Sequence, residues 1–410
     1  MTLLETPAGR RWFFAVLYAT EGAPMGFIWW ALPTLLARQG VAVEAITTMT
    51  AAATLPWVLK FLAGPVVDAS LLRGARLRTW ILTSQSAMVV SLAAVAWIDW
   101  PNELTLLTVL LVAHAVCAAT QDVAIDTLAI RVVPPEELGR INGAMQAGML
   151  TGRAVVAAGT VALASQLGPA APIIAVSAVV ALPMWLVARA TPDLPVPAAP
   201  IPGIRKWLQA LSGRDALLGI GIALTAGAGF EFLSVVIGPL LVQYGASDGQ
   251  VSVFFGLLAP ASLVAGALVS GRVTDIVAPI RGTASGIVAI GLLAGTLGAI
   301  LAAGSAPGPL PLMLMVVLVY AAIGFFTAAS YALFMRLARG DLAATRFSVF
   351  MAMTNACEAG SGFAGGRLQG VIGYGTTMIL LVGVSLVALP LLWRLSVGRG
   401  ETSAEEGRAR

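Results

Sequence analysis

Long apolar stretches, each bounded by charged residues or by proline and glycine, recur along the whole chain. A bilayer core about 30 Å thick is crossed by about 20 apolar residues in an α-helix, which satisfies its own backbone hydrogen bonds in lipid. The pattern therefore predicts an all-α, polytopic membrane protein. Its twelve transmembrane helices are expected at 12–36, 45–66, 80–98, 104–130, 141–166, 170–188, 215–241, 250–271, 283–303, 311–335, 347–366 and 375–393.

The composition agrees with this prediction and argues against several classes of function. Hydrophobic residues make up 58% and charged residues 11% of the 410 positions, against about 25% charged in a typical soluble protein. One histidine and two cysteines leave little for a metal site or a disulfide framework. The basic residues are spread too evenly for a nucleic-acid surface. We expect a lipid bilayer around the chain, no cofactor, no metal and no nucleic-acid partner.

Motifs for catalysis and for ATP binding are missing from the sequence. His114 is the one histidine, and neither HExxH nor GxxxxGK[ST] occurs. A membrane-embedded enzyme is therefore disfavoured, and transport would have to be driven by a gradient rather than by ATP. A sensor that keeps a binding cavity without transport is an alternative.

Positive charges set the expected orientation. Most of the 24 Lys and Arg residues fall in alternate connecting segments, whereas the other segments hold only Arg38 and Arg367. Cytoplasmic loops of membrane proteins are enriched in Lys and Arg. We therefore expect a multi-pass protein of the inner (cytoplasmic) membrane with both termini in the cytoplasm.

The predicted spans divide into two similar groups of six. Five prolines between positions 192 and 202 favour an extended linker between the groups. We expect two pseudo-symmetric six-helix halves at 1–189 and 215–394, a cytoplasmic linker at 190–214 and a cytoplasmic tail at 395–410.

A short motif repeats at corresponding places in the two halves. Gly64-x-x-x-Asp68 follows the second span, and Gly271-x-x-x-Asp275 follows the eighth, 207 residues later. An Arg-Gly pair comes after each copy. The repetition indicates that the two halves are related copies of one unit.

At least six charged residues fall inside the predicted spans, where a charge at the bilayer centre costs about 2.5–3.5 kcal/mol on insertion scales. Such residues usually line a cavity or pair with each other. We expect Asp122 to pair with Arg153, either in a transport pathway or as a purely structural ion pair. Unpaired acids are candidate proton carriers, because burial disfavours their ionised form. The expected substrate and proton pathway comprises Glu21, Asp122, Asp126, Arg153, Glu231 and Glu358.

The first span carries a predicted weak point beside its acid. In Glu21-Gly-Ala-Pro24-Met-Gly26 a proline lies between two glycines, which either opens the helix beside a cavity or forms a plain packing kink. Polar and aromatic residues at similar depth are further cavity candidates, with an interfacial aromatic belt as the alternative for the tryptophans. These candidates are Tyr18, Trp29, Trp30, Gln121, Asn142, Gln146, Tyr331 and Asn355.

Two six-helix halves with a duplicated acidic and basic loop resemble the major facilitator superfamily. The resemblance covers essentially the whole chain and implies the major facilitator fold. It also implies that an Asp at the end of the second helix and arginines in the next loop form a gating latch. The alternative is a solvated loop that only fixes topology. The latch residues would be Asp68 with Arg73, Arg76 or Arg78, and Asp275 with Arg281.

Three further strings resemble the AmpG-like branch of that superfamily, which includes permeases for muropeptides, acetyl-CoA and siderophores of the rhizobactin and pyochelin type. They are LYATEGAPMGFIWWALPTLLARQG, LPWVLKFLAGPVVDA and ATQDVAIDTLAIRVV. Ala69 departs from the pattern, because many members have Arg after the Asp of the second helix. The latch assignment is accordingly weaker than the motif of the fourth helix.

Length and charge bear on the substrate within this branch. Muropeptide permeases tend to carry extra helices, for which 410 residues leave little room. Acetyl-CoA is strongly anionic, whereas the charges at mid-membrane depth are five acids and one clear base, Arg153, with Lys60 nearer the cytoplasmic end. We therefore expect a secondary transporter that is a monomer and works as a proton-coupled symporter. It is expected to import a bulky small-molecule substrate such as a ferric siderophore. Muropeptide import and export of a small molecule are the alternatives, and acetyl-CoA transport is disfavoured.

Overall fold

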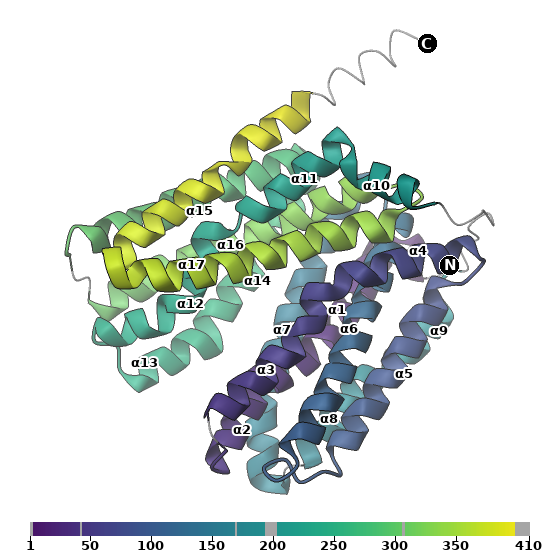
Figure 1. Ribbon diagram of the computed structural model, residues 1–410, viewed down its shortest axis with the longest axis horizontal. Coiled ribbons are helices and arrows are strands. Elements are labelled where there is room, and N and C mark those ends of the chain that lie inside the picture. Colours follow the sequence, from purple (N-terminus) through teal and green to yellow (C-terminus); the bar gives the residue numbers. More distant parts are fainter. Residues whose placement is uncertain (1–2, 42, 169, 193–202, 306–307, 398–410) are drawn as a thin grey trace. The chain divides into compact units, whose positions relative to one another are not determined.

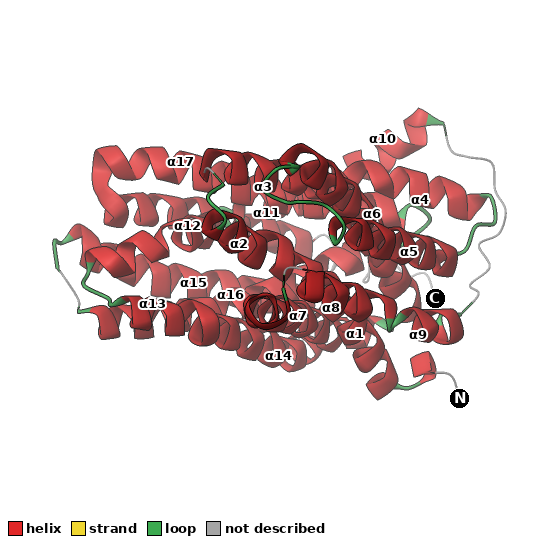
Figure 2. Cartoon of the chain, turned by 90° about the horizontal axis from the view of Figure 1, so that it is seen from below, coloured by secondary structure: helices red, strands yellow, loops and turns green. Residues whose placement is uncertain are grey.

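The computed structural model describes residues 3–41, 43–168, 170–192, 203–305 and 308–397. The described residues form helices and connecting turns, with no strand among them (Figures 1 and 2). The prediction of an all-α chain is confirmed. Among the described residues, eight helical stretches are by themselves long and apolar enough to cross a membrane.

The first six predicted spans are each covered by one or more helices. They are α1 Pro7–Met25, a π-helical turn Gly26–Ala31 and α2 Leu32–Arg38; α3 Val43–Val58, a 3₁₀ turn Leu59–Leu62 and α4 Ala63–Leu72; α5 Leu77–Val95; α6 Leu104–Val132; α7 Leu138–Leu167; and α8 Ala170–Ala181 with α9 Met184–Ala190.

The last six predicted spans are covered in the same way, after a short helix α10. The elements are α10 Ile204–Ser212; α11 Arg214–Thr225 and α12 Ala228–Gln243; α13 Asp248–Val253, a π-helical turn Phe254–Leu258 and α14 Ala259–Val277; α15 Pro279–Ala302; α16 Pro309–Ala338; and α17 Ala343–Leu386, followed by helix at 388–397. Two predicted spans fall in α17, where Gly373 (φ 78°, ψ 164°) breaks the helical path. Only glycine adopts this conformation without strain.

The chain forms two compact units, each of which contains a short segment from the other half of the sequence. Unit 1 comprises Met1–Glu137, Ala144–Gly203 and Ala338–Ser348; unit 2 comprises Leu138–Gly143, Ile204–Leu337 and Val349–Arg410. The central part of the expected linker, residues 193–202, lies outside the described residues, as does the tail from 398.

Unit 1 has an apolar core that joins α5 and α6 to their neighbours. Met88, Leu92, Leu107 and Leu111 are fully buried there, together with Phe27 of the π-helical turn. Burial of such side chains stabilises soluble proteins by about 1.5–3 kcal/mol each; inside a bilayer, tight packing supplies much of this role. The core holds α6 firmly beside α1 and α5, which fixes the helix that carries the polar residues described next.

Four glycines allow α1 and α7 to cross at close range within unit 1. A Cβ atom on Gly22 or Gly26 would overlap the backbone carbonyls of Met149 and Arg153, and one on Gly148 or Gly152 would overlap carbonyls of α1. Small residues at helix crossings let backbones approach closely in membranes. The glycines of the predicted weak point therefore have a packing function, and the helix changes to π-helical geometry at the second of them, Gly26.

Candidate functional site

Unit 1 buries a compact group of ionisable side chains, which we call the acid cluster: Tyr18, Glu21, Lys60, Asp122 and Asp126. Each member is at most 9% exposed. Lys60 Nζ lies 2.7 Å from Asp122 Oδ2, and the Tyr18 hydroxyl donates a hydrogen bond to Asp126 Oδ1. The cluster combines three carboxyl groups with one ammonium group.

Local helix geometry explains why these residues meet. Asp122 and Asp126 are four residues apart on α6 and so project from one face, one turn apart. Tyr18 and Glu21 are three residues apart on α1 and share a face in the same way. Lys60 lies in the 3₁₀ turn after Pro56, where the change of helical pitch redirects the side chains of the second span.

Glu21 is the member with unused hydrogen-bonding capacity. Its Oε2 atom is buried and has no hydrogen-bond partner among the described residues. Its carboxyl group lies close enough to Asp122, Asp126 and Lys60 for their charges to interact. A buried group of three carboxylates and one ammonium cannot hold all its charges cheaply, because each uncompensated charge loses its hydration.

The pairing of Asp122 with Arg153 stays a prediction, and the structure shows a different basic partner for Asp122. Asp122 is paired with Lys60, which comes from the second span rather than the fifth. Arg153 Nη2 lies 3.0 Å from the sulfur of Met25, next to the α1–α7 crossing. Depth along the helices suggested Arg153, but depth does not specify which face of α7 a residue occupies.

The other cavity candidates of unit 1 lie in varied surroundings. Both amide atoms of Gln121 and Nε2 of Gln146 are buried without a hydrogen-bond partner among the described residues. Trp29 Nε1 donates to Thr54 Oγ1 at 2.8 Å, and the side chain of Trp30 lies outside the described part. Gln121 and Gln146 therefore retain free donors or acceptors that a polar ligand or water could satisfy.

Unit 2 contains its own acidic pair. Glu231 of α12 is half-buried, and Glu358 of α17 is exposed in the isolated chain, near enough for the two charges to interact. Each of the two glutamates Glu21 and Glu231 lies near an irregularity of its helix. Glu231 follows the break between α11 and α12, whereas Glu21 precedes the π-helical turn that begins at Gly26. Tyr331 and Asn355 are half-buried, whereas Asn142 is fully buried and donates to the Leu138 carbonyl oxygen and the Met335 sulfur.

The first copy of the repeated motif caps a helix. Asp68 accepts hydrogen bonds from the backbone N–H groups of Ala344 (3.3 Å) and Thr345 (2.8 Å) and from the Thr345 hydroxyl (2.7 Å), at the start of α17. Gly64, one turn earlier, lets α4 approach, because a Cβ there would overlap the Ser348 side chain. A carboxylate at a helix N-terminus satisfies orphan N–H groups and the helix dipole.

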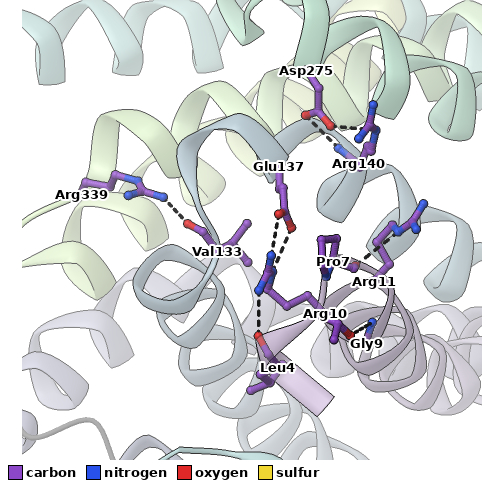
Figure 3. A network of polar contacts seen from close by, with 11 residues as sticks. Leu4, Pro7, Gly9, Arg10, Arg11, Val133, Glu137, Arg140, Asp275 and Arg339 are labelled. Carbon is purple, nitrogen blue, oxygen red and sulfur yellow. Dashed lines mark hydrogen bonds and ion pairs between the residues drawn. The ribbon is translucent and has the colours of Figure 1, made fainter. Parts of the chain in front are cut away.

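The second copy of the motif does the same within unit 2. Asp275 Oδ1 accepts from the backbone N–H of Arg140, in the first turn of α7, and Oδ2 lies 3.2 Å from Arg140 Nε (Figure 3). Gly271 contacts the Gly139–Arg140 backbone closely. The glycine in each copy thus makes room for a helix start, and the aspartate caps it.

The latch between these aspartates and the loop arginines stays a prediction, and the contacts that the structure shows for the two aspartates are to other segments. Arg73, Arg76 and Arg281 have exposed side chains, and Arg78 donates to the Ala188 carbonyl oxygen. The contacts recorded for Asp68 are to the start of α17, and those for Asp275 are to Arg140. The loop arginines were expected from the resemblance to the superfamily, whereas the partners shown here come from distant segments.

Two further arginines, Arg10 and Arg339, make polar contacts with the segment that leads into α7 (Figure 3). Arg10 donates to both carboxylate oxygens of Glu137, at 2.9 and 2.5 Å, and to the Leu4 carbonyl oxygen. Arg339 donates to the Val133 carbonyl oxygen at 2.5 Å. Sequence reasoning missed these residues and assigned Lys60 no site role. For Lys60, its position inside an apolar span was the signal that could have identified it.

The chain belongs to the Major Facilitator Superfamily, whose sequence profile matches residues 14–356. The solved structures it resembles share this fold, as the sequence predicted. A bacterial homologue of the iron transporter ferroportin, in an outward-facing state, is 14% identical with a TM-score of 0.72 over 95% of this chain and 99% of that one. The human organic anion transporter MFSD10 is 14% identical, with a TM-score of 0.73 over 93% of this chain and 97% of that one. The proton:xylose symporter XylE is 11% identical, with a TM-score of 0.71 over 95% of each chain.

Curated relatives match a shorter part of the chain. An uncharacterized protein of Schizosaccharomyces pombe is 32% identical over 151 residues, which is 34% of this chain and 28% of that protein. The candidate transporter AmpG 1 of Rickettsia prowazekii is 26% identical over 133 residues, or 31% of this chain and 30% of that protein. The chain spans about a third of the length of these relatives. The second match agrees with the expected resemblance to the AmpG-like branch.

Proposed function

We propose that this protein is a secondary active transporter that couples movement of a small solute to the proton gradient. The observation that carries the proposal is the acid cluster, in which Glu21, Asp122 and Asp126 are buried with Lys60 as their ammonium partner. Such a charge imbalance inside a membrane is relieved by binding protons. No catalytic activity needs to be invoked.

Glu21 is the first choice for the proton carrier. Lys60 is bonded to Asp122, and Tyr18 donates to Asp126, so these two acids have partners for their ionised forms. Glu21 Oε2 has none among the described residues, and its helix changes geometry five residues further on. Gain or loss of a proton at Glu21 would therefore change the charge balance beside a deformable segment of α1. Glu231 is the corresponding candidate in unit 2.

Replacement of Glu21 by Gln tests the proposal in proteoliposomes. The amide mimics the protonated carboxyl group, so accumulation driven by an imposed pH gradient should be lost. Counterflow of substrate should persist, since exchange needs binding and movement but no net proton transfer. Glu136→Gln, at an exposed position, is the matched control and should retain both activities. If Glu21→Gln retained gradient-driven accumulation, Glu21 would be excluded as the proton carrier.

For the substrate we propose import of a bulky solute such as a ferric siderophore. Support comes from the short connections between the described helices and from the acid-rich interior of unit 1. A muropeptide is the second candidate, favoured by the match to the candidate transporter AmpG 1. Counterflow assays with a ferric siderophore, a muropeptide and acetyl-CoA distinguish these solutes, and the direction of net uptake distinguishes import from export.

We further propose that the two capped helix starts act as a conformational latch. Asp68 holds the start of α17 within unit 1, and Asp275 holds the start of α7 within unit 2. Loss of either cap would release a segment that one half of the sequence contributes to the other unit. Cysteine cross-linking of residue pairs at these starts, with and without substrate, tests whether the contacts open during transport.

The placement that goes with this function is a monomer in the inner membrane with both termini cytoplasmic. The asymmetric distribution of Lys and Arg supports it. Reporter fusions after residue 397 and within the 97–103 connection should report opposite sides of the membrane. Light scattering of the purified protein, corrected for bound detergent, measures the oligomeric state.

A further inference from the structure

The segment between the two six-helix groups contains a helix that the sequence analysis did not expect. Residues Ile204–Ser212 form α10, which packs against α11 in unit 2. Gly213 between them is extended (φ −62°, ψ 149°). A single extended residue interrupts the helical path, so α10 does not simply prolong α11.

The two sides of α10 differ strongly in polarity. Trp207, Leu208 and Leu211 follow Ile204 at helical spacing and form one apolar stripe, whereas Arg205, Lys206 and Gln209 occupy the opposite side. Ala210 is buried against the protein, but Leu208 is 61% exposed. Arg205 and Lys206 are exposed as well. The protein thus covers the flank of the helix at Ala210 and leaves part of the apolar stripe uncovered.

Contacts at the end of α10 indicate its depth. Arg214, the first residue of α11, donates to the Arg394 carbonyl oxygen at 3.2 Å. The α10–α11 junction therefore lies level with the end of the last helix. The adjacent Trp393 is 66% exposed, and exposed tryptophans at the ends of spanning helices typically lie at the bilayer–water interface.

We propose that α10 lies along the cytoplasmic surface of the bilayer and binds anionic phospholipid. Its apolar stripe enters the region between headgroups and acyl chains, and Arg205 and Lys206 contact the phosphate-bearing headgroups. The position of the junction, the exposed Leu208 and the two cations at the helix start match what an anionic bilayer surface offers. This interaction is independent of the transported solute and of proton coupling.

Spin labels placed on the two faces of α10 test the proposal in the full-length protein. Leu208→Cys and Gln209→Cys are labelled in a background in which Cys117 and Cys357 are replaced by Ala, and each protein is reconstituted in phosphatidylcholine vesicles with or without 30% phosphatidylglycerol. Collision rates with oxygen and with a water-soluble nickel complex report depth. The label at position 208 should be accessible to oxygen and protected from nickel, and the label at 209 should show the reverse.

Phosphatidylglycerol should increase the protection at 208, and Arg205→Gln with Lys206→Gln should abolish that increase. Arg336→Gln, an exposed cation in the last turn of α16, is the matched control and should not. Equal nickel accessibility at both positions in vesicles would overturn the proposal. So would a label at position 208 that is poorly accessible to oxygen as well as to nickel in vesicles, because protein rather than acyl chains would then cover the stripe.

Discussion

Removal of Lys60 is expected to destabilise the protein more than removal of its partner Asp122. Lys60 Nζ and Asp122 Oδ2 are 2.7 Å apart with side chains 9% and 5% exposed, so their Coulomb attraction is about 6 kcal/mol at an effective dielectric constant of about 20. Much of this is offset by desolvation. Loss of one partner of a buried pair typically costs about 3–5 kcal/mol.

The cluster makes the two losses unequal. Lys60→Met leaves three carboxyl groups without their ammonium partner, so we expect the full cost of about 3–5 kcal/mol. Asp122→Asn keeps an acceptor for Lys60 and leaves Glu21 and Asp126 to balance it, so we expect about 1.5–3 kcal/mol, typical of a charged hydrogen bond. The double variant should be more stable than Lys60→Met alone.

The assay is unfolding in mixed micelles, followed at fixed pH and lipid content, with the coupling energy taken from the double-mutant cycle. The cycle of Asp122→Asn with Arg153→Gln tests the pairing expected from the sequence, and its coupling energy should be smaller than that of Lys60 with Asp122. The pairing of Lys60 with Asp122 would be refuted if the effects of their two substitutions were additive while those of Asp122 and Arg153 were coupled. Arg153 would then be the partner of Asp122, as the sequence predicts.

Three further outcomes are expected. Asp68→Ala should remove the cap of α17 and lower the free energy of unfolding by about 1–2 kcal/mol, and unchanged stability and transport would argue against the latch. Gly152→Leu should disrupt the α1–α7 crossing and abolish folded yield, since its side chain would overlap the Ala19 carbonyl; normal thermal stability would contradict this packing. Tyr18→Phe removes the hydrogen bond to Asp126 and should shift the pH profile of accumulation while sparing counterflow, and an unchanged profile would separate Tyr18 from coupling.

The fold could be predicted from the sequence because its signals are local and strong. Spans such as 104–130 carry enough apolar residues to require burial in lipid, and alternate positive segments require them to cross back and forth. Where prediction failed, local signals conflicted. The amphipathic stripe of α10 was readable at helical spacing, but the surrounding prolines favoured an extended linker.

The sequence indicated which residues belong to the candidate site better than it indicated which contacts they make. Embedded acids such as Glu21 and Asp126 stand out because charge is costly in lipid. Their partners depend on helix rotation and on local pitch, which the apolar pattern does not specify. Lys60 reaches Asp122 from a 3₁₀ turn, and a uniform α-helix would place the same residue at a different angle.

The repeated glycine–aspartate motif also shows that the sequence pattern predicts a helix face but not the segment that this face contacts. Its spacing of four predicts that Gly64 and Asp68 share one helix face, which is a local consequence of 3.6 residues per turn. What that face meets is a helix start almost 280 residues away in sequence, and no periodicity within α4 encodes it. The second copy meets the start of α7 with the same arrangement of close glycine and capping carboxylate. The duplication therefore preserves a way of holding a helix N-terminus. In the loop after the first copy, Arg78 donates to the Ala188 carbonyl oxygen, and a role of the loop arginines in fixing topology stays a prediction from their positive charge.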